Sequence, residues 1–276
     1  MEKERIDITT ALVGVLVVLL SALCALAGLV LARHLLPLPR RKELLDASTR
    51  VNAIFAAIRS VFTILLAFSV VIVWQQYNSA DATVQREANY LGDIYWNANQ
   101  LPSSQRQQMQ ELARSYAQVV INEEWAMMEQ GEHSTRVDKI MRELRETNNE
   151  FEPRTSTEEM LQREELTRIN DLANERGLRL HANREGIPLM LWIVLISGGV
   201  VMVAFTYLLE MRAFWIHALS VVTLTAILAL VSYTIYTIDS PFGQGVRLGP
   251  EALEFQLGPE ALEFQLHEFE EFEKGG

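Results

Sequence analysis

The sequence predicts an all-α integral membrane protein with four transmembrane helices in two hairpins and a helical extramembrane domain between them. Four apolar segments each exceed the roughly 20 residues needed to cross a hydrocarbon core of about 30 Å. They are grouped in two closely spaced pairs, and a polar stretch of about 110 residues with helical periodicity separates the pairs. Because lipid offers no hydrogen-bond partner to an open backbone, each segment that crosses the membrane must be helical.

The two pairs divide the 276-residue chain into four parts. The apolar segments are Ile8–Ala32, Val51–Gln75, Ile187–Leu209 and Ala213–Ile238. The predicted domains are a first transmembrane hairpin at 1–76, a helical extramembrane domain at 77–186, a second transmembrane hairpin at 187–239 and an acidic C-terminal tail at 240–276. The first segment is too long for the apolar core of a secretory signal, so we interpret it as a membrane span.

Small residues recur at helical spacing in the first span. Ser21 and Ala25 are four residues apart, as are Cys24 and Gly28. Such pairs let two helices approach closely in lipid, so we expect this face to pack against a neighbouring helix. Cys24 is the only cysteine, which excludes disulfides within one chain and zinc sites with several cysteines.

Arg59 is a charged residue inside the second apolar segment. Asn52 lies seven residues before it and Thr63 four residues after it, so the three side chains share one face of the helix. A charged side chain in a span either extends to the headgroups or faces a cavity or pore. Extension of Arg59 to the headgroups is the favoured interpretation. The alternative is a face toward a cavity or pore, for which Asn52, Arg59 and Thr63 are candidate positions.

The second apolar helix is expected to continue beyond the membrane. After the span, apolar residues recur at alternating spacings of four and three, as one face of a helix requires. These residues are Val84, Ala88, Leu91, Tyr95 and Ala98. Leu101–Pro102 interrupts the pattern, since proline lacks the amide hydrogen that a helix interior needs.

Two further helices follow in the polar stretch. Ser103 or Ser104 can cap the first of them, and Gly131 ends it. Ser134 can cap the second. The inward face of this second helix is predicted to carry Val137, Ile140, Met141 and Leu144.

A last helix of the polar stretch runs toward His181. Ser156 and Glu159 have the spacing of a capping box and mark its start. The apolar stripes of all these helices are narrow. We therefore expect a helical bundle that packs on itself, on the extended membrane helices or on other subunits.

The third and fourth apolar segments carry glycines and hydroxyl groups. Gly198 and Gly199 mark a close helix contact or a flexible point. Thr225, Ser232 and Tyr236 are candidate pore positions in the fourth segment. Their hydroxyl groups either hydrogen-bond across helices or line a permeation path.

Positive charges are more frequent in the two short connectors than on the opposite side of the predicted membrane. The connectors hold Arg33, Arg40, Arg41, Lys42, Arg50 and Arg212, and the opposite side holds Lys3, Arg5 and Arg247. By the positive-inside rule, the connectors face the cytoplasm and the extramembrane domain lies on the outer side.

The C-terminal tail is strongly acidic. Eight glutamates and one lysine in residues 249–276 account for seven of the eleven net negative charges of the chain. The tail contains the sequence GPEALEFQL twice, at Gly249–Leu257 and Gly258–Leu266. Two copies are too few for a repeat array, so this is either a duplication without function or an acidic docking segment.

No motif for catalysis, cofactor binding or nucleic-acid binding is found, and we expect no enzyme activity, no cofactor and no nucleic-acid partner. The five histidines are scattered. Glu123 and Glu124 are adjacent carboxylates, for which a solvated helix face is a better interpretation than a metal site. For His217, beside Trp215, packing at headgroup level is a better interpretation than a proton relay.

Four motifs occur in order around the two apolar pairs, namely VWQQYNSADATVQREANYLGDIYW, INEEWAMMEQG, RLHANREGIPLMLW and IDSPFGQGVRLGPEALEF. Together they resemble the bestrophin-like domain family of bacterial membrane proteins, a family of unknown function, and the resemblance covers about residues 50–257. Gln244 departs from the glycine expected in the family. Because Gly243 and Gly245 flank it, we expect a shifted turn and the same fold. The second GPEALEFQL copy lies outside the family pattern.

The resemblance implies a distant relation to bestrophins, which are oligomeric anion channels with four membrane helices per subunit. It implies a homo-oligomer in contact with the lipid bilayer, in the bacterial inner (plasma) membrane as a multi-pass protein. The calcium-binding acidic cluster of bestrophins has no counterpart that we can map on this chain. In bestrophins the large extramembrane part is cytoplasmic, opposite to the side that the charge bias indicates here.

The favoured function is an oligomeric membrane channel or pore for anions, by this resemblance. A subunit with four helices has little room for a pore, so several subunits around an axis would form it. The alternative is a non-conducting membrane scaffold or sensor, in which the helical domain or the acidic tail binds a partner protein.

Overall fold

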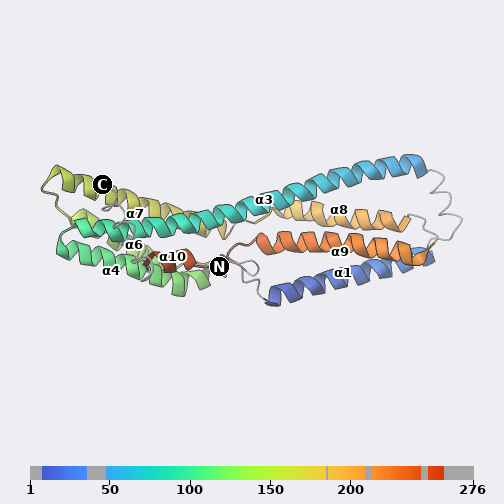
Figure 1. Ribbon diagram of the computed structural model, residues 1–276, viewed down its shortest axis with the longest axis horizontal. Helices are drawn as coiled ribbons and strands as arrows, with labels where there is room; N and C mark the ends of the chain where they lie inside the picture. The colour runs from blue at the N-terminus through green and yellow to red at the C-terminus, as the bar shows by residue number, and fades with distance from the viewer. Residues whose placement is uncertain (1–7, 36–47, 185, 209–212, 244–247, 258–276) are drawn as a thin grey trace, which may run out of the picture. The chain divides into compact units, whose positions relative to one another are not determined.

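The computed structural model of the chain describes residues 8–35, 48–184, 186–208, 213–243 and 248–257. All regular elements in these ranges are helices, and the ranges contain no strand, which confirms the all-α class. The chain divides into two compact units, and each is described by itself (Figure 1). The described residues of the apolar unit are 8–35, 48–76, 186–208 and 213–240, and those of the polar unit are 77–184, 241–243 and 248–257.

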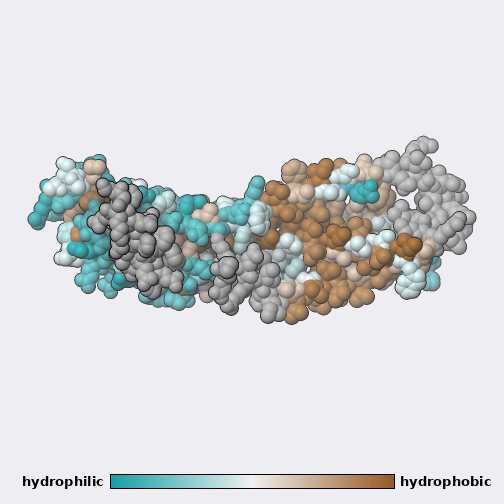
Figure 2. All heavy atoms as spheres, viewed as in Figure 1, coloured by the Kyte–Doolittle hydropathy of each residue, from teal (hydrophilic) through white to brown (hydrophobic). Residues whose placement is uncertain are grey.

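Within the described ranges, four helices are long and apolar enough to cross a membrane, as predicted. They are α1 (Ile8–Leu35), α3 (Ser48–Asn97), of which residues up to 76 belong to the apolar unit, α8 (Leu189–Leu208) and α9 (Phe214–Ile238). Only 11 to 22% of the residues in their apolar windows are buried. Most of the apolar surface of this unit therefore faces outward, as Figure 2 shows in brown, and it suits contact with lipid.

Helix α1 packs along α9, and α8 contacts both of them. The pairing of α1 with α9 is antiparallel: Gly14, early in α1, lies against Tyr233, late in α9, while Arg33, late in α1, contacts His217, early in α9.

Helices α3 and α8 are also antiparallel and pack through aromatic rings. The ring of Phe62 lies over Gly198, and Phe55 stacks on Phe205 with ring centroids 4.6 Å apart. A close contact was one of two expectations for the glycine pair, and it is confirmed for Gly198. Gly199 differs, since a side chain there would meet nothing within 4 Å.

The polar unit begins with the second part of α3, which is uninterrupted up to Asn97, so the predicted continuation of this helix is confirmed. The helical conformation is interrupted at Leu101–Pro102, also as predicted. The remaining elements are η1 (Ala98–Gln100), α4 (Ser103–Val119), the π-helical segment η2 (Val120–Glu124), α5 (Trp125–Met128), α6 (Thr135–Glu150), α7 (Ser156–Ala182) and α10 (Glu251–Leu257).

A large apolar core joins α3, α4, α6 and α7 in the polar unit. Leu91 of α3, Tyr116 of α4, Leu144 of α6 and Leu172 of α7 are all completely buried in it. The predicted inward residues of α6 are buried as well, namely Val137, Ile140, Met141 and Leu144. The narrow apolar stripes thus pack on one another within the unit.

Two of the predicted helix ends are confirmed. The hydroxyl of Ser134 accepts a hydrogen bond from the amide of Arg136 at 3.2 Å and caps α6. Gly131 has a φ of 74°, in the left-handed region that glycine adopts without strain, and it follows the end of α5.

Two other predicted caps are wrong. Pro102 occupies the N-cap position of α4, so Ser103 and Ser104 lie inside the first turn and cap nothing. The capping box of α7 is formed by Thr155 and Glu158, one residue before the predicted pair Ser156 and Glu159. Both pairs have the same spacing, and the extended backbone of Thr155 decides between them, with φ −129° and ψ 158°.

Several expectations concern residues outside the described ranges. They include the charge bias carried by Lys3, Arg5, Arg40, Arg41, Lys42, Arg212 and Arg247, the turn at Gln244 and the second GPEALEFQL copy. Membrane orientation and the role of the tandem sequence therefore stay predictions, as do the four domain boundaries.

Candidate functional site

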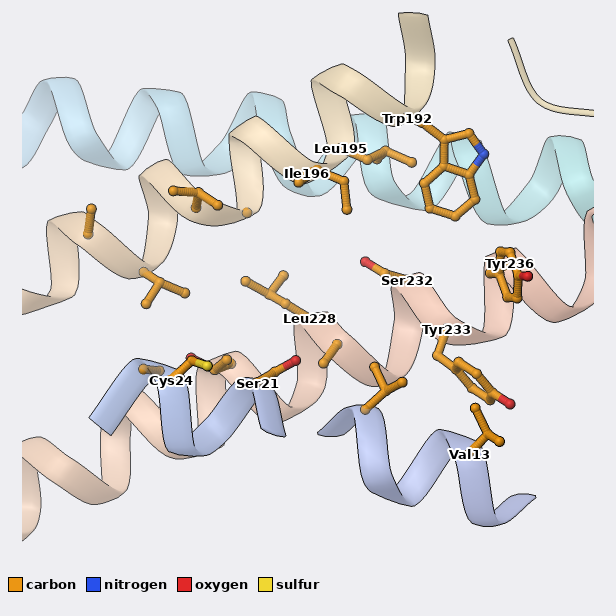
Figure 3. A pocket seen from close by; sticks show the side chains of 18 of the residues that line it. Val13, Ser21, Cys24, Trp192, Leu195, Ile196, Leu228, Ser232, Tyr233 and Tyr236 are labelled. Atoms are coloured by element: carbon orange, nitrogen blue, oxygen red, sulfur yellow. The ribbon is translucent and has the colours of Figure 1, made fainter. Parts of the chain in front are cut away.

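A groove of about 660 Å³ lies in the apolar unit between α1, α8 and α9 (Figure 3). Most of the side chains that line it are apolar, among them Val17, Leu195 and Leu228. Pockets for small molecules in proteins have this size range and this predominantly apolar lining. The groove is therefore a candidate binding site of the apolar unit.

Two tyrosines in the groove wall attach α8 and α9 to α1. The hydroxyl of Tyr207 donates to the carbonyl of Ala25 at 3.0 Å, and its ring lies over Gly28. The hydroxyl of Tyr233 donates to the carbonyl of Thr10 at 2.6 Å, and its ring lies over Gly14. The predicted close approach at the small residues of α1 thus takes the form of aromatic rings seated on glycine.

Three predicted pore positions line this groove: Thr225, Ser232 and Tyr236. Figure 3 shows Ser232 with its hydroxyl directed from α9 into the space between the helices, with Ser21 directed into it from α1. The three hydroxyl residues of the fourth apolar segment therefore line one groove. Their place in a permeation path remains a prediction.

Thr225 differs from the other hydroxyl residues of α9. Its side chain is only 9% exposed, and its Oγ1 has no hydrogen-bond partner within the described part of the chain. Ser220 and Thr234 instead donate to carbonyls four residues earlier, at 2.9 and 3.0 Å. A buried hydroxyl group without a partner costs free energy. The Oγ1 of Thr225 is almost completely inaccessible, so it is closed off from the groove.

The other three predicted positions lie on α3 and do not line the groove. Arg59 and Thr63 are exposed on the surface of the subunit. The hydroxyl of Thr63 donates to the carbonyl of Arg59 at 2.9 Å, within its own helix. The side chain of Asn52 lies outside the described part of the structure. The six predicted positions therefore form two groups, one on α3 and one in the groove.

His217 joins three helices at one end of the apolar unit. Its Nε2 lies 2.8 Å from the carbonyl oxygen of Thr206, which can only accept, so Nε2 carries the hydrogen. Nδ1 then accepts from Nη2 of Arg33 at 3.2 Å. The guanidinium of Arg33 also lies 4.7 Å from the ring centroid of Phe214. His217 is 1% exposed and both its nitrogens are engaged, which agrees with the packing interpretation.

A buried network of charges lies in the polar unit. Arg179 of α7 is completely buried, and its guanidinium donates to Glu87 of α3 at 2.6 and 3.0 Å and to Glu124 of η2 at 2.7 Å. The Tyr116 hydroxyl donates to Glu87 at 2.7 Å. The side chains of Glu87 and Glu124 are also 0% exposed. Three charged groups in a core require this mutual compensation, because unpaired charges are costly away from water.

Arg176 extends the network toward the surface. It donates to Glu124 at 2.6 and 3.1 Å and to Asp138 of α6 at 2.7 Å. Burial alone raises the pKa of Glu124, but the hydrogen bonds and charges of Arg176 and Arg179 outweigh it and lower the pKa. Burial lowers the pKa of Arg176 and of Arg179. Glu124 raises the pKa of Arg176, and Glu87 and Glu124 raise that of Arg179, so both pKa values end above the ordinary value. Glu124, Arg176 and Arg179 are therefore charged.

The expectation of a solvated helix face at Glu123 and Glu124 is wrong for Glu124, which is buried at the end of the π-helical segment. Glu123 is part-exposed and pairs with Arg136. A signal for the network does exist in the sequence. Ile169, Leu172, Arg176 and Arg179 follow one another at spacings of three and four, so two arginines occupy positions on the inward stripe of α7.

Glu165 is a third buried carboxylate among the described residues of the polar unit, at 2% exposure. Its Oε1 has no hydrogen-bond partner within the described residues. Burial raises its pKa to about 8, and the charges of Asp93 and Glu164 add to the rise. A hydrogen bond from Asn97 and the charge of Arg168 oppose the rise without cancelling it.

The described residues contain no group of three or more histidine, cysteine, aspartate or glutamate side chains that could hold a metal ion.

Comparison with known proteins gives one finding. The sequence model of the Bestrophin-like domain matches residues 19–253, which is most of the chain. No curated protein and no solved structure matches the chain.

Proposed function

Because the chain belongs to the Bestrophin-like family, we propose that it is the subunit of an oligomeric membrane channel that conducts anions. The proposal includes a two-hairpin arrangement of the four spans in the bacterial inner membrane. It also includes an extramembrane position for the polar unit. The family membership and the four candidate spans support a multi-pass membrane protein as the starting point.

The exposed position of Arg59 on α3 is the observation that carries the proposal. A charged side chain within a span costs several kcal/mol when it faces lipid, on the order of 3 kcal/mol at the centre of a helix. Among the described residues it has no ion-pair partner to offset that cost. An aqueous path at the axis of an assembly would hydrate the guanidinium, and a ring of arginines would favour anions over cations.

The surface of the apolar unit supports assembly of several subunits. Large apolar side chains of α3 stay exposed, including Val61 at 60% and Phe68 at 62%. Four helices provide too few walls to enclose a water-filled path, so a ring of identical subunits is the simplest arrangement that gives one. Neighbouring subunits would cover part of this surface, and lipid would cover the rest.

The test is the ion selectivity of the Arg59→Ala variant in planar bilayers. Wild-type protein under a chloride gradient is expected to show a reversal potential close to that of chloride, and Arg59→Ala is expected to shift it toward zero. Arg59→Lys, which keeps the charge, is the matched control and should stay near the wild-type value. An unchanged reversal potential in Arg59→Ala, with assembly intact, would remove Arg59 from the path.

The scaffold or sensor alternative predicts a different result. Recordings would then show no conductance under any ion gradient or voltage. Purification from native membranes would yield a partner protein in stoichiometric amount, bound to the polar unit. Both results together would replace the channel proposal.

A further inference from the structure

The short helix α10 (Glu251–Leu257) is held on the polar unit by a completely buried leucine. The helix contacts α4 (Figure 1). Leu253 is 0% exposed and belongs to the large apolar core, and the part-buried Ala252 packs against the same core. Glu251 and Glu254 are exposed. One face of this acidic helix therefore completes the core of the polar unit.

The residue at the entry to α10 is held as well. Leu248 is buried in a second apolar cluster together with Phe242. Its amide donates to the carbonyl of Pro241 at 2.8 Å, and its carbonyl accepts from Nε1 of Trp125 at 3.2 Å. We call the surface that holds Leu248 and Leu253 the α10 site. This site recognises two leucines five residues apart, together with the backbone of the first leucine.

The sequence that fills the α10 site occurs twice in the chain. LGPEALEFQL stands at residues 248–257 and again at residues 257–266. The leucine pair of the second copy, in the same positions as the pair held in the α10 site, is Leu257 and Leu262. Because the two copies are identical over ten residues, the second copy has every group that the site contacts in the first.

The two copies differ in the length of chain that connects them to Pro241. Six residues, 242–247, lead to the first copy, and fifteen residues, 242–256, lead to the second. The entropic cost of closing a loop grows only with the logarithm of its length, so the longer connection disfavours docking of the second copy by roughly fourfold. With equal contacts, the two copies are then docked in a ratio of about four to one.

We propose that the α10 site binds either copy of LGPEALEFQL from the same subunit, so that this segment exchanges between two registers nine residues apart. In the first register, residues 248–257 are docked. In the second register, residues 257–266 take their place, and the acidic sequence after residue 266 moves nine residues closer to the site. The inference concerns the polar unit alone and does not rest on the proposed channel.

Hydrogen exchange of the purified full-length protein, followed by mass spectrometry, measures which copy is docked. Fragments that extend to Arg247 or to His267 identify the copies despite their identical sequence. In wild type, the amides of the first copy should be protected by no more than about fivefold, because this copy is undocked in about a fifth of the molecules. In Leu253→Asp, protection should move to the second copy, since the core does not accommodate an unpaired carboxylate.

A variant without residues 258–266 is the matched single-copy protein. It keeps the first copy and the residues that connect it to Pro241, and it lacks the competing copy. Protection of the first copy is expected to rise severalfold above the wild-type value. The control is the double substitution Glu254→Gln and Glu263→Gln, which changes exposed Glu254 and its counterpart in the second copy. It should leave the distribution of protection as in wild type.

Thermal melting gives a second test that does not depend on exchange rates. Leu253→Asp alone should lower the melting temperature only slightly, because the second copy fills the site. Leu262→Asp alone should leave the melting temperature unchanged. The double variant has no copy that fits the site, so its loss should clearly exceed the sum of the two single losses.

Three outcomes would overturn the proposal. The first is a second copy that stays unprotected in Leu253→Asp. The second is equal protection of the first copy in wild type and in the variant without residues 258–266, which would show that the second copy does not compete for the site. The third is protection in Leu253→Asp that is lost when the assembly is dissociated into single subunits, which would show docking on a neighbouring subunit.

Discussion

Arg179 shows at the scale of one residue how a charge is held inside the polar unit. Its guanidinium is shared between Glu87 and Glu124, and it also lies 5.0 Å from the ring centroid of Trp125. The three charged groups come from α7, α3 and η2, so the network joins elements that are far apart in sequence. Such a network is worth little as net stability, but removal of one member is costly because the others lose their compensation.

Replacement of this arginine tests that argument. Arg179→Met is expected to destabilise the protein by roughly 3–5 kcal/mol, because two buried carboxylates then lack their common cation. Thermal unfolding followed by circular dichroism measures the change. Arg163→Met is the control: Arg163 is exposed, pairs with Glu159 within α7, and should cost less than about 1 kcal/mol. Equal effects of the two substitutions would contradict the argument.

The buried carboxyl group of Glu165 predicts how the free energy of unfolding depends on pH. Its pKa is about 8 in the folded protein, above the ordinary value of 4.5, so the folded state binds more protons than the unfolded state between these values. The contribution of Glu165 to the free energy of unfolding is fully present below pH 4.5, and it is lost as the pH rises through 8. The free energy of unfolding should fall by up to about 1.4 kcal/mol per pH unit in this window.

Glu165→Gln should remove this part of the pH dependence, since glutamine stays neutral. Unfolding midpoints measured at several pH values between 5 and 8 provide the comparison. Glu111→Gln, on an exposed position of α4, is the control and should keep the wild-type slope. A slope that Glu165→Gln leaves unchanged would show that another group is responsible.

At the scale of elements, the contact between α3 and α8 depends on Gly198. A side chain there would overlap the ring of Phe62, while one at Gly199 would meet nothing. Gly198→Leu is expected to cost roughly 1–3 kcal/mol through overpacking, measured by thermal unfolding in detergent. Gly199→Ala, the control, should stay close to wild type.

A second substitution tests the cause of that cost. Phe62→Ala removes the ring that Gly198→Leu would strike, so the double variant should be more stable than the sum of the two single effects predicts. Strictly additive effects would mean that the cost at Gly198 comes from elsewhere.

The sequence predicted the elements better than it predicted their ends. The start of α7 was placed one residue late because Thr155–Glu158 and Ser156–Glu159 have the same spacing, and only backbone conformation separates them. The π-helical segment at Val120–Glu124 has no sequence signature of its own, yet it ends on buried Glu124 and is followed by the partly buried Trp125 and the buried Met128. Glu124 of this segment pairs with Arg176 and Arg179 of α7, and such contacts between residues far apart in sequence are not contained in local patterns.

For the whole molecule, the four spans were predictable because the requirement for about 20 apolar residues is strong and local. The groove was predictable only in part. Thr225, Ser232 and Tyr236 were found as hydroxyl groups on one helix, whereas the contributions of Tyr207, Tyr233 and Gly199 depend on how three helices meet. Contacts between distant helices, such as Arg33 with His217, likewise cannot be read from spacing.

The proposed assembly of several subunits predicts the mass of the protein in detergent solution. Light scattering on the detergent-solubilised protein, corrected for bound detergent, should give a multiple of the 31.3 kDa subunit. Exposed apolar residues of α3 such as Phe68 are expected to be covered in that assembly. A mass of one subunit under mild solubilisation would contradict the ring arrangement on which the proposed channel depends.

Conductance of the purified wild-type protein in planar lipid bilayers tests the central claim most directly. The channel proposal predicts discrete current steps under a chloride gradient, with a reversal potential that follows chloride and moves when Arg59 loses its charge. A bilayer that contains correctly assembled protein and stays silent at every voltage and gradient would contradict the proposal.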